Sequence, residues 1–217
     1  MSKRVVILHG LWMTGLTTQW FAARLRAAGF LPEIFGYHSI VGGPDAAVPR
    51  LAKRLRKGGE AHIVAHSLGG LIALEALASE PDLPVSRMVC LGVPLCGSGA
   101  AAGLARWPAA SLWLGRSADL LRRGCVTWPA SVQVGMIAGA SPLGLGVFVA
   151  RFADANDGTV SVAETQTPGL ADHVVINASH SGLLFSAEAA TQAVEFLDKG
   201  RFTSLQERLS GATVISD

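Results

Sequence analysis

The chain has 217 residues, a length that one domain of ordinary size accounts for, so we expect a single domain over 1–217. Half of the residues are hydrophobic and 16% are charged, which excludes a disordered chain and requires a large buried core. The formal net charge of +2 is too small for a nucleic-acid-binding surface over the whole protein, and we expect no nucleic-acid partner.

Apolar runs bounded by turn residues alternate with segments of helical period along the chain. Strands are expected at 4–9, 32–37, 61–66, 86–93, 132–138 and 173–178. Most of these runs are continuously apolar, as strands buried on both faces should be. The helices between them are expected to bury one face each, formed by Phe21, Leu25 and Ala28, by Val48, Leu51, Ala52 and Leu55, and, in a last helix over about 181–199, by Ala187, Ala190, Val194 and Leu197. This alternation predicts an α/β protein with a mostly parallel sheet and helices on both faces.

The three cysteines, Cys90, Cys96 and Cys125, fit neither a CxxC redox pair nor a zinc ribbon, and we expect reduced core thiols. The uncharged stretches 88–105 and 124–150 are long enough to raise the question of a membrane span, but prolines and glycines interrupt both. The apolar run near the amino end is only four residues long, so no export signal is visible. We expect no membrane span and a cytoplasmic location.

The segment 97–128 lies between two expected strands and is longer than a simple crossover needs. It holds three of the five tryptophans, and we expect it to form a short inserted cover in which Trp107 and Trp113 line an acyl pocket. Its arginines are Arg106, Arg116, Arg122 and Arg123. Guanidinium groups pair well with phosphate, although a solvated helix face explains these arginines equally well.

The expected strand 61–66 leads directly into Ser67, which is followed by Leu68 and a helical pattern. Such a tight turn from strand to helix exposes a serine at the carboxyl edge of the sheet, which makes Ser67 a candidate nucleophile. The helix behind it offers free amide groups and the positive end of a dipole where negative charge would develop. A serine that only caps this helix is the alternative. Ala65 stands where the G-x-S-x-G pattern has its first glycine, which is a departure of one methyl group.

Four short motifs follow one another along the chain: VILHGL at 6–11, AHSLG at 65–69, NDGTV at 156–160 and SHSGL at 179–183. In this order they resemble the α/β-hydrolase fold family, and within it the small lipase-like serine esterases. The resemblance implies an α/β-hydrolase fold over nearly the whole chain and a catalytic triad in the chain order Ser67, Asp157, His180. No metal or organic cofactor is expected for this chemistry.

Each triad member has an expected role. Ser67 attacks the acyl carbon, His180 takes its proton, and Asp157 orients the imidazole of His180. The resemblance also assigns an oxyanion hole to the backbone N–H groups of Leu11 and Leu68, the first of which follows the HG pair of the first motif.

Further residues are candidates for the wall of the acyl pocket or for the acidic member of the triad. Trp12 and Met13 are expected to shape the acyl pocket, although Trp12 could instead be a partly buried loop anchor. Asp154 competes with Asp157 as the acid, and Glu164 is a further carboxylate that could serve.

The expected function is therefore hydrolysis of a small-molecule carboxylic ester, with short to medium uncharged acyl chains, through an acyl-enzyme. A thioesterase acting on a phosphate-bearing carrier uses the same triad and is the alternative. Two other classes are weaker: a nicotinamide-binding protein, from the loose G-x-G-x-x-A match at 97–102, and a binding protein without catalysis. His62 and His66 lack the glutamate of a zinc motif, so no metal site is expected. The sequence leaves the physiological substrate and the oligomeric state open.

Overall fold

The computed structural model describes residues 2–99, 115–124, 127–142 and 155–204. In this described part of the chain, six strands form one sheet in which every pairing is parallel, in the order β2-β1-β3-β4-β5-β6. The strands are β1 (Arg4–Leu8), β2 (Leu31–Phe35), β3 (Ala61–His66), β4 (Val85–Leu91), β5 (Gln133–Gly139) and β6 (Asp172–Ile176). All carboxyl ends therefore meet at one edge, where an α/β sheet places its functional residues.

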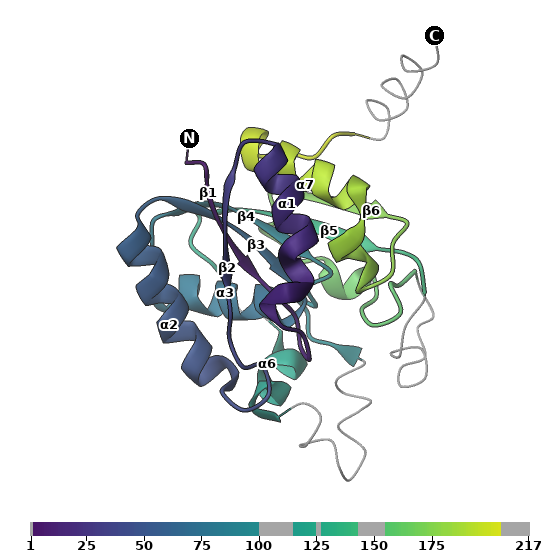
Figure 1. Cartoon of the computed structure of the whole chain (residues 1–217). Coiled ribbons are helices and arrows are strands. Elements are labelled where there is room, and N and C mark those ends of the chain that lie inside the picture. The colour runs from purple at the N-terminus through teal and green to yellow at the C-terminus, as the bar shows by residue number, and fades with distance from the viewer. Residues whose placement is uncertain (1, 100–114, 125–126, 143–154, 205–217) are drawn as a thin grey trace.

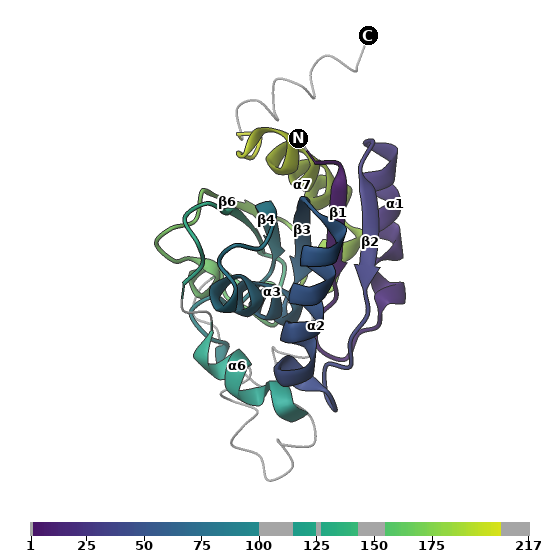
Figure 2. The same ribbon diagram turned by 90° about the vertical axis from the view of Figure 1, so that its left-hand side faces the viewer.

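Helices cover both faces of this sheet (Figure 1). One layer contains α1 (Gln19–Ala27) and α7 (Ala187–Lys199), and the other contains α2 (Gly43–Gly58), α3 (Leu68–Ser79) and the short α6 (Ala118–Arg123). Figure 2 shows α2 and α3 lying side by side, with α6 beyond their ends. The prediction of helices on both faces is confirmed.

Two apolar layers follow from the alternation of side chains along each strand. On β1, Val6 and Leu8 pack toward α2 and α3, whereas Val5 and Ile7 pack toward α1 and α7. β3 is buried along its whole length because it lies inside the sheet with a helix layer on each face. Each aliphatic side chain buried in these layers contributes about 1.5–3 kcal/mol.

The predicted strands agree with the observed ones to within two residues at each end, but two helix faces were wrong in part. α1 ends at Ala27, so Ala28 lies beyond it and is exposed. The predicted last helix is divided: a 3-10 helix spans Gly182–Phe185, and α7 begins only at Ala187, which is exposed. Ser186 causes the break, because its Oγ accepts the amide of Ala189 as a helix N-cap.

The cysteine prediction also needs a correction. Cys90 is a buried core thiol on β4, as expected, but Cys96 is exposed and its Sγ donates to the carbonyl of Gln166 at 2.9 Å. Cys96 lies in the loop after β4, and among the described residues it is left exposed. Cys125 is outside the described residues.

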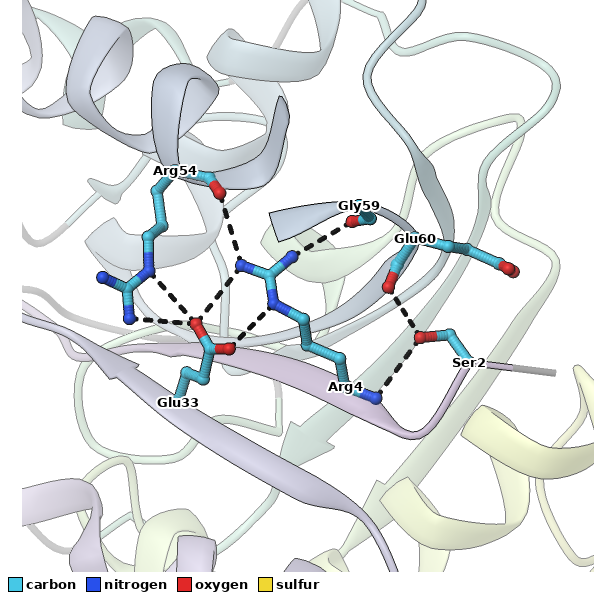
Figure 3. Close-up of polar contacts among 6 residues, drawn as sticks. All are labelled: Ser2, Arg4, Glu33, Arg54, Gly59 and Glu60. Carbon is cyan, nitrogen blue, oxygen red and sulfur yellow. Dashed lines mark hydrogen bonds and ion pairs between the residues drawn. The ribbon is translucent and has the colours of Figure 1, made fainter. Parts of the chain in front are cut away.

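An ionic cluster joins three elements at the amino edge of the sheet (Figure 3). The guanidinium of Arg4 on β1 donates to both carboxylate oxygens of Glu33 on β2, at 2.9 and 3.2 Å. Arg54 on α2 pairs with the same carboxylate at 2.9 Å. These two arginines lower the pKa of Glu33, chiefly through the hydrogen bonds from Arg4. The cluster lies at the opposite edge of the sheet from Ser67.

Much of the predicted insert at 97–128 is outside the described residues. Its described parts include a 3-10 helix at Gly115–Ser117 and α6, whose buried Leu120 and Leu121 pack into the α2–α3 layer. Within the described part of the chain, no helix is long and apolar enough to cross a bilayer.

Candidate active site

Ser67 forms a single-residue turn between β3 and α3. β3 ends at His66 and α3 begins at Leu68. The backbone of Ser67 has φ 52° and ψ −125°, a conformation that costs a non-glycine residue on the order of 1–3 kcal/mol. Its amide donates to the carbonyl of Leu91 on β4 at 2.9 Å, which ties the turn to the neighbouring strand. The strained turn places the serine at the carboxyl edge of the sheet.

Small residues around Ser67 let the β1 turn approach this elbow. A Cβ on Gly69 would lie 2.5 Å from the carbonyl oxygen of His9, so only glycine fits there. Ala65, the departure from the G-x-S-x-G pattern, is fully buried in the α2–α3 layer, where its methyl group contributes to the core. The extra methyl group therefore does not obstruct the turn.

His180 has a partner for each of its four polar groups. Its ring Nε2 lies 2.9 Å from Oγ of Ser67, and its Nδ1 lies 2.7 Å from Oδ2 of Asp157. Its backbone amide donates to the carbonyl of Asp157 at 2.8 Å, and its own carbonyl accepts from Nε2 of His66 at 2.9 Å. The imidazole is thereby held between the hydroxyl and the carboxylate, with Nε2 directed at the serine.

Asp157 is 1% exposed and lies in the turn marked by Asn-Asp-Gly. While Oδ2 faces His180, Oδ1 accepts the amides of Thr159 and Val160 at 2.9 and 2.7 Å. Three donors thus surround this carboxylate and fix its orientation toward His180. Glu164 is engaged elsewhere, because its carboxylate accepts the amides of Ser161 and Gly99. Asp154 lies outside the described residues.

The turn after β1 lies directly against the nucleophile. A Cβ on Gly10 would lie 3.1 Å from Cβ of Ser67. Nδ1 of His9 lies 2.9 Å from the carbonyl oxygen of Gly10, and because a carbonyl can only accept, Nδ1 carries the proton. The peptide bond between Gly10 and Leu11 is trans, so its C=O and N–H point in opposite directions. The hydrogen bond that fixes the Gly10 carbonyl therefore also fixes the direction of the Leu11 N–H. Leu68 opens α3, and amides in the first turn of a helix have no acceptor within it.

The expected pocket residues have different environments. Trp12 is 50% exposed with φ 57°, and its amide donates to Oγ of Ser39 at 3.3 Å. A side chain exposed by half fits a pocket wall and a partly buried loop anchor equally, so both interpretations stay open. Met13 is half-buried and packs against the α1–α7 layer. Trp107 and Trp113 lie outside the described residues. Among the described residues, no group of three His, Cys, Asp or Glu side chains could hold a metal ion.

No family model and no curated protein matches this chain. Solved structures do match it. The mature form of the lipase BlEst2 from Bacillus licheniformis has a TM-score of 0.73 at 19% identity, with 90% of each chain covered. A metagenomic carboxyl esterase has a TM-score of 0.64 at 22% identity, with 82% of this chain and 64% of that chain covered.

A third match is a Xanthomonas campestris structure assigned to the hydrolases of the alpha/beta superfamily, with a TM-score of 0.59 at 15% identity, covering 92% of this chain and 99% of that one. The chain has the α/β-hydrolase fold. This likeness concerns the fold alone. In this α/β-hydrolase fold, Ser67, His180 and Asp157 come from three separate loops at the carboxyl edge of the sheet.

Two residues near the α/β-hydrolase elbow had no role in the sequence-based prediction. The sequence raises His66 only as a candidate zinc ligand, although its ring centroid lies 4.7 Å from that of His180. The sequence places Tyr37 only in a strand, and its hydroxyl donates to the carbonyl of His9 at 2.6 Å. The only sequence signal for a role of His66 at the site is that it directly precedes Ser67. No local signal marks the contact of Tyr37.

Proposed function

We propose that this protein is a serine hydrolase that cleaves carboxylic esters through an acyl-enzyme. The hydrogen-bonded line from Ser67 through His180 to Asp157, starting at a strained elbow, is the observation that carries the proposal. A serine that merely capped α3 would need neither this backbone conformation nor a buried imidazole–carboxylate pair beside it. Within the described residues, the side chain of Ser67 also forms no capping hydrogen bond with the backbone of α3.

In the proposed reaction, Oγ of Ser67 attacks the acyl carbon while Nε2 of His180 takes its proton. The carbonyl oxygen becomes an oxyanion, which the N–H groups of Leu11 and Leu68 stabilise. His180 then passes the proton to the departing alkoxide, which leaves as an alcohol. Water attacks the acyl-enzyme with His180 again as the base, and release of the acid restores Ser67. Asp157 keeps the Nδ1 proton of His180 in place throughout.

Exposed apolar side chains in the segments that follow β1 and His180 favour an uncharged substrate. Trp12, Leu16 and Phe185 are half or more exposed, and they lie in the segments that follow β1 and His180. Large apolar side chains in such positions suit a short or medium acyl chain. Lipase and carboxyl esterase are the names of two of the similar structures.

The thioesterase alternative has lost part of its support. Arg122 pairs with Asp119 and Arg123 pairs with Glu75, both on the surface, so these guanidinium groups already have acidic partners. Arg106 lies outside the described residues. The nicotinamide alternative is weaker still, because β4 ends at Leu91 and leaves a loop before Gly97, where the dinucleotide motif requires a direct turn into a helix.

Labelling with a fluorophosphonate and hydrolysis of p-nitrophenyl esters test the proposal together. We expect the probe to label Ser67, and Ser67→Ala to abolish labelling and lower kcat by about a millionfold. Ser79→Ala is the matched control, since this exposed serine ends α3 and lies away from the site. Full turnover by Ser67→Ala would refute the proposal. Acyl-CoA thioesters cleaved more than tenfold better than the matching esters would favour the thioesterase.

A further inference from the structure

His66 makes a buried contact with the loop that carries His180. Its Nε2 lies 2.9 Å from the carbonyl oxygen of His180, a residue 114 positions later in the chain. The carbonyl can only accept, so Nε2 of His66 carries the proton and donates it. Because His66 is the residue before Ser67, this single bond connects the nucleophile strand to the base loop.

The second ring nitrogen of His66 is held without a proton. Nδ1 is buried and has no hydrogen-bond partner among the described residues. Burial, and then the neighbouring ring of His180, lower the pKa of His66 to about 3. His66 therefore stays neutral when His180 takes a proton, and no second positive charge forms beside it.

The same nitrogen faces the turn after β1. A Cβ on Gly10 would lie only 2.8 Å from Nδ1 of His66, so the glycine packs closely against this ring. His66 thus contacts three parts of the candidate site, namely the elbow, the base loop and the oxyanion turn. Its ring is tilted 48° from that of His180.

We propose that His66 is a positioning residue, whose Nε2–H holds the backbone carbonyl of His180 so that the imidazole of His180 stays in line between Ser67 and Asp157. The proposal rests on the proposed hydrolase function. Without the bond from His66, the backbone of His180 keeps, within the described ranges, only its amide bond to Asp157. A shift of the ring by about 1 Å is enough to cost on the order of a hundredfold in rate.

Two variants of His66 separate the hydrogen bond from the packing of the ring. His66→Phe keeps an aromatic ring and removes the donor, whereas His66→Gln keeps an N–H donor at about the position of Nε2. We expect His66→Phe to lower kcat by about tenfold to a hundredfold with little change in KM, and His66→Gln to recover most of the loss. His62→Phe is the matched control: His62 is a second buried histidine on β3, and it contacts Ser86 away from the site.

A measurement that does not need turnover accompanies the kinetics. The proton shared between Nδ1 of His180 and Asp157 gives a low-field NMR resonance when the ring is held in place. We expect this resonance in the wild type, in His66→Gln and in His62→Phe, and its loss or broadening in His66→Phe. A merely structural role for His66 would lower thermal stability and leave both the resonance and the kcat of the folded protein unchanged.

The outcomes separate the two proposals. Wild-type kcat in folded His66→Phe, or a His66→Gln variant as impaired as His66→Phe, would overturn the positioning role. If the wild type neither hydrolyses esters nor reacts with the fluorophosphonate, the proposed function fails, and the resonance alone then decides whether His66 holds His180.

Discussion

The phenol ring of Tyr37 is stacked on the imidazole of His9, with ring centroids 4.3 Å apart and planes 7° from parallel. The tyrosine hydroxyl also donates to the carbonyl of His9, and Nδ1 of His9 donates to the carbonyl of Gly10. A residue that follows β2 thus holds the turn after β1, which carries the proposed oxyanion donor Leu11. The direction of that N–H depends on these bonds being intact.

Replacing His9 tests this dependence. His9→Phe keeps a ring for Tyr37 to stack on and removes the donor to the Gly10 carbonyl, which frees the peptide to rotate. We expect kcat for p-nitrophenyl butyrate to fall by up to about a hundredfold, approaching the loss of one oxyanion donor, with a smaller change in KM. His38→Phe changes an exposed histidine of the next loop and should have no effect. Unchanged kcat in His9→Phe would show that the turn holds itself.

Asp157→Asn should be far more harmful than its small change in shape suggests. The amides of Thr159 and Val160 require an oxygen at Oδ1, so the new amide group would face Nδ1 of His180. That arrangement places the imidazole proton on Nε2 of His180. A protonated Nε2 cannot accept the proton of Ser67. We expect kcat to fall on the order of ten-thousandfold. Asp154→Asn is the control, and a larger loss there would move the acid to Asp154.

Gly10→Ala should impair the site without unfolding the protein. The new methyl group would lie 2.8 Å from Nδ1 of His66 and 3.1 Å from Cβ of Ser67, so the β1 turn has to move away from the nucleophile. We expect a loss of about a hundredfold in kcat, because misplacement of about 1 Å is this costly. Gly36→Ala adds the same methyl group in open space and should keep wild-type kcat. Equal activity of the two variants would contradict the predicted crowding.

Buried neutral histidines should make the protein less stable in mild acid. Burial lowers the pKa of His62 and His66 below the ordinary 6.5, in His66 to about 3. Below pH 6.5 the unfolded chain therefore binds protons that the folded chain does not, so stability is full above that pH and falls as the pH drops toward the folded value. Each such histidine contributes a slope of up to about 1.4 kcal/mol per pH unit. Urea denaturation at pH 7 and pH 5 measures it.

His62→Gln serves to assign part of this slope. The variant removes one titrating histidine far from the proposed catalytic groups, so its stability should depend less steeply on pH between 7 and 5 than that of the wild type. An identical slope would show that His62 is not the group responsible. A wild-type stability that does not change over this range would contradict the burial effect on both histidines.

The ionic cluster at the amino edge should influence stability and not activity (Figure 3). Glu33→Gln removes the charge that Arg4 and Arg54 share, and since Glu33 is about one third exposed we expect a loss of no more than about 1 kcal/mol in unfolding free energy. Because the pKa of Glu33 is lowered, this contribution is present above pH 4.5 and disappears as the pH falls through the folded value.

Asp198→Asn is the comparison for the ionic cluster. Asp198 lies 3.8 Å from Lys3 with both side chains about half exposed, so its loss should not be measurable. Chemical denaturation and ester hydrolysis on the same preparations check both expectations. A large drop of kcat in Glu33→Gln would mean that the amino edge communicates with the site.

Local sequence patterns predicted much of the fold. Mostly apolar runs indicated the six strands, of which β3 is fully buried and the edge strands β2 and β6 only partly, and the turn signals around Ser67 and Asp157 indicated the loops that follow β3 and β5. Such features can be read locally because hydrophobic period and turn preference act over a few residues. For the same reason the chain order of the candidate residues Ser67, Asp157 and His180 could be proposed from motifs alone.

Tertiary packing decided what those local signals could not. The N-cap at Ser186 decides where α7 begins, whereas packing against the sheet decides which face is buried, and the predicted face included the exposed Ala187. The partners of His66 also required the fold, since residues 66 and 180 meet only after β3, β4, β5 and β6 have assembled. Bonds between residues that are distant in the chain depend on how whole elements pack, because burial, and not local preference, brings their side chains together.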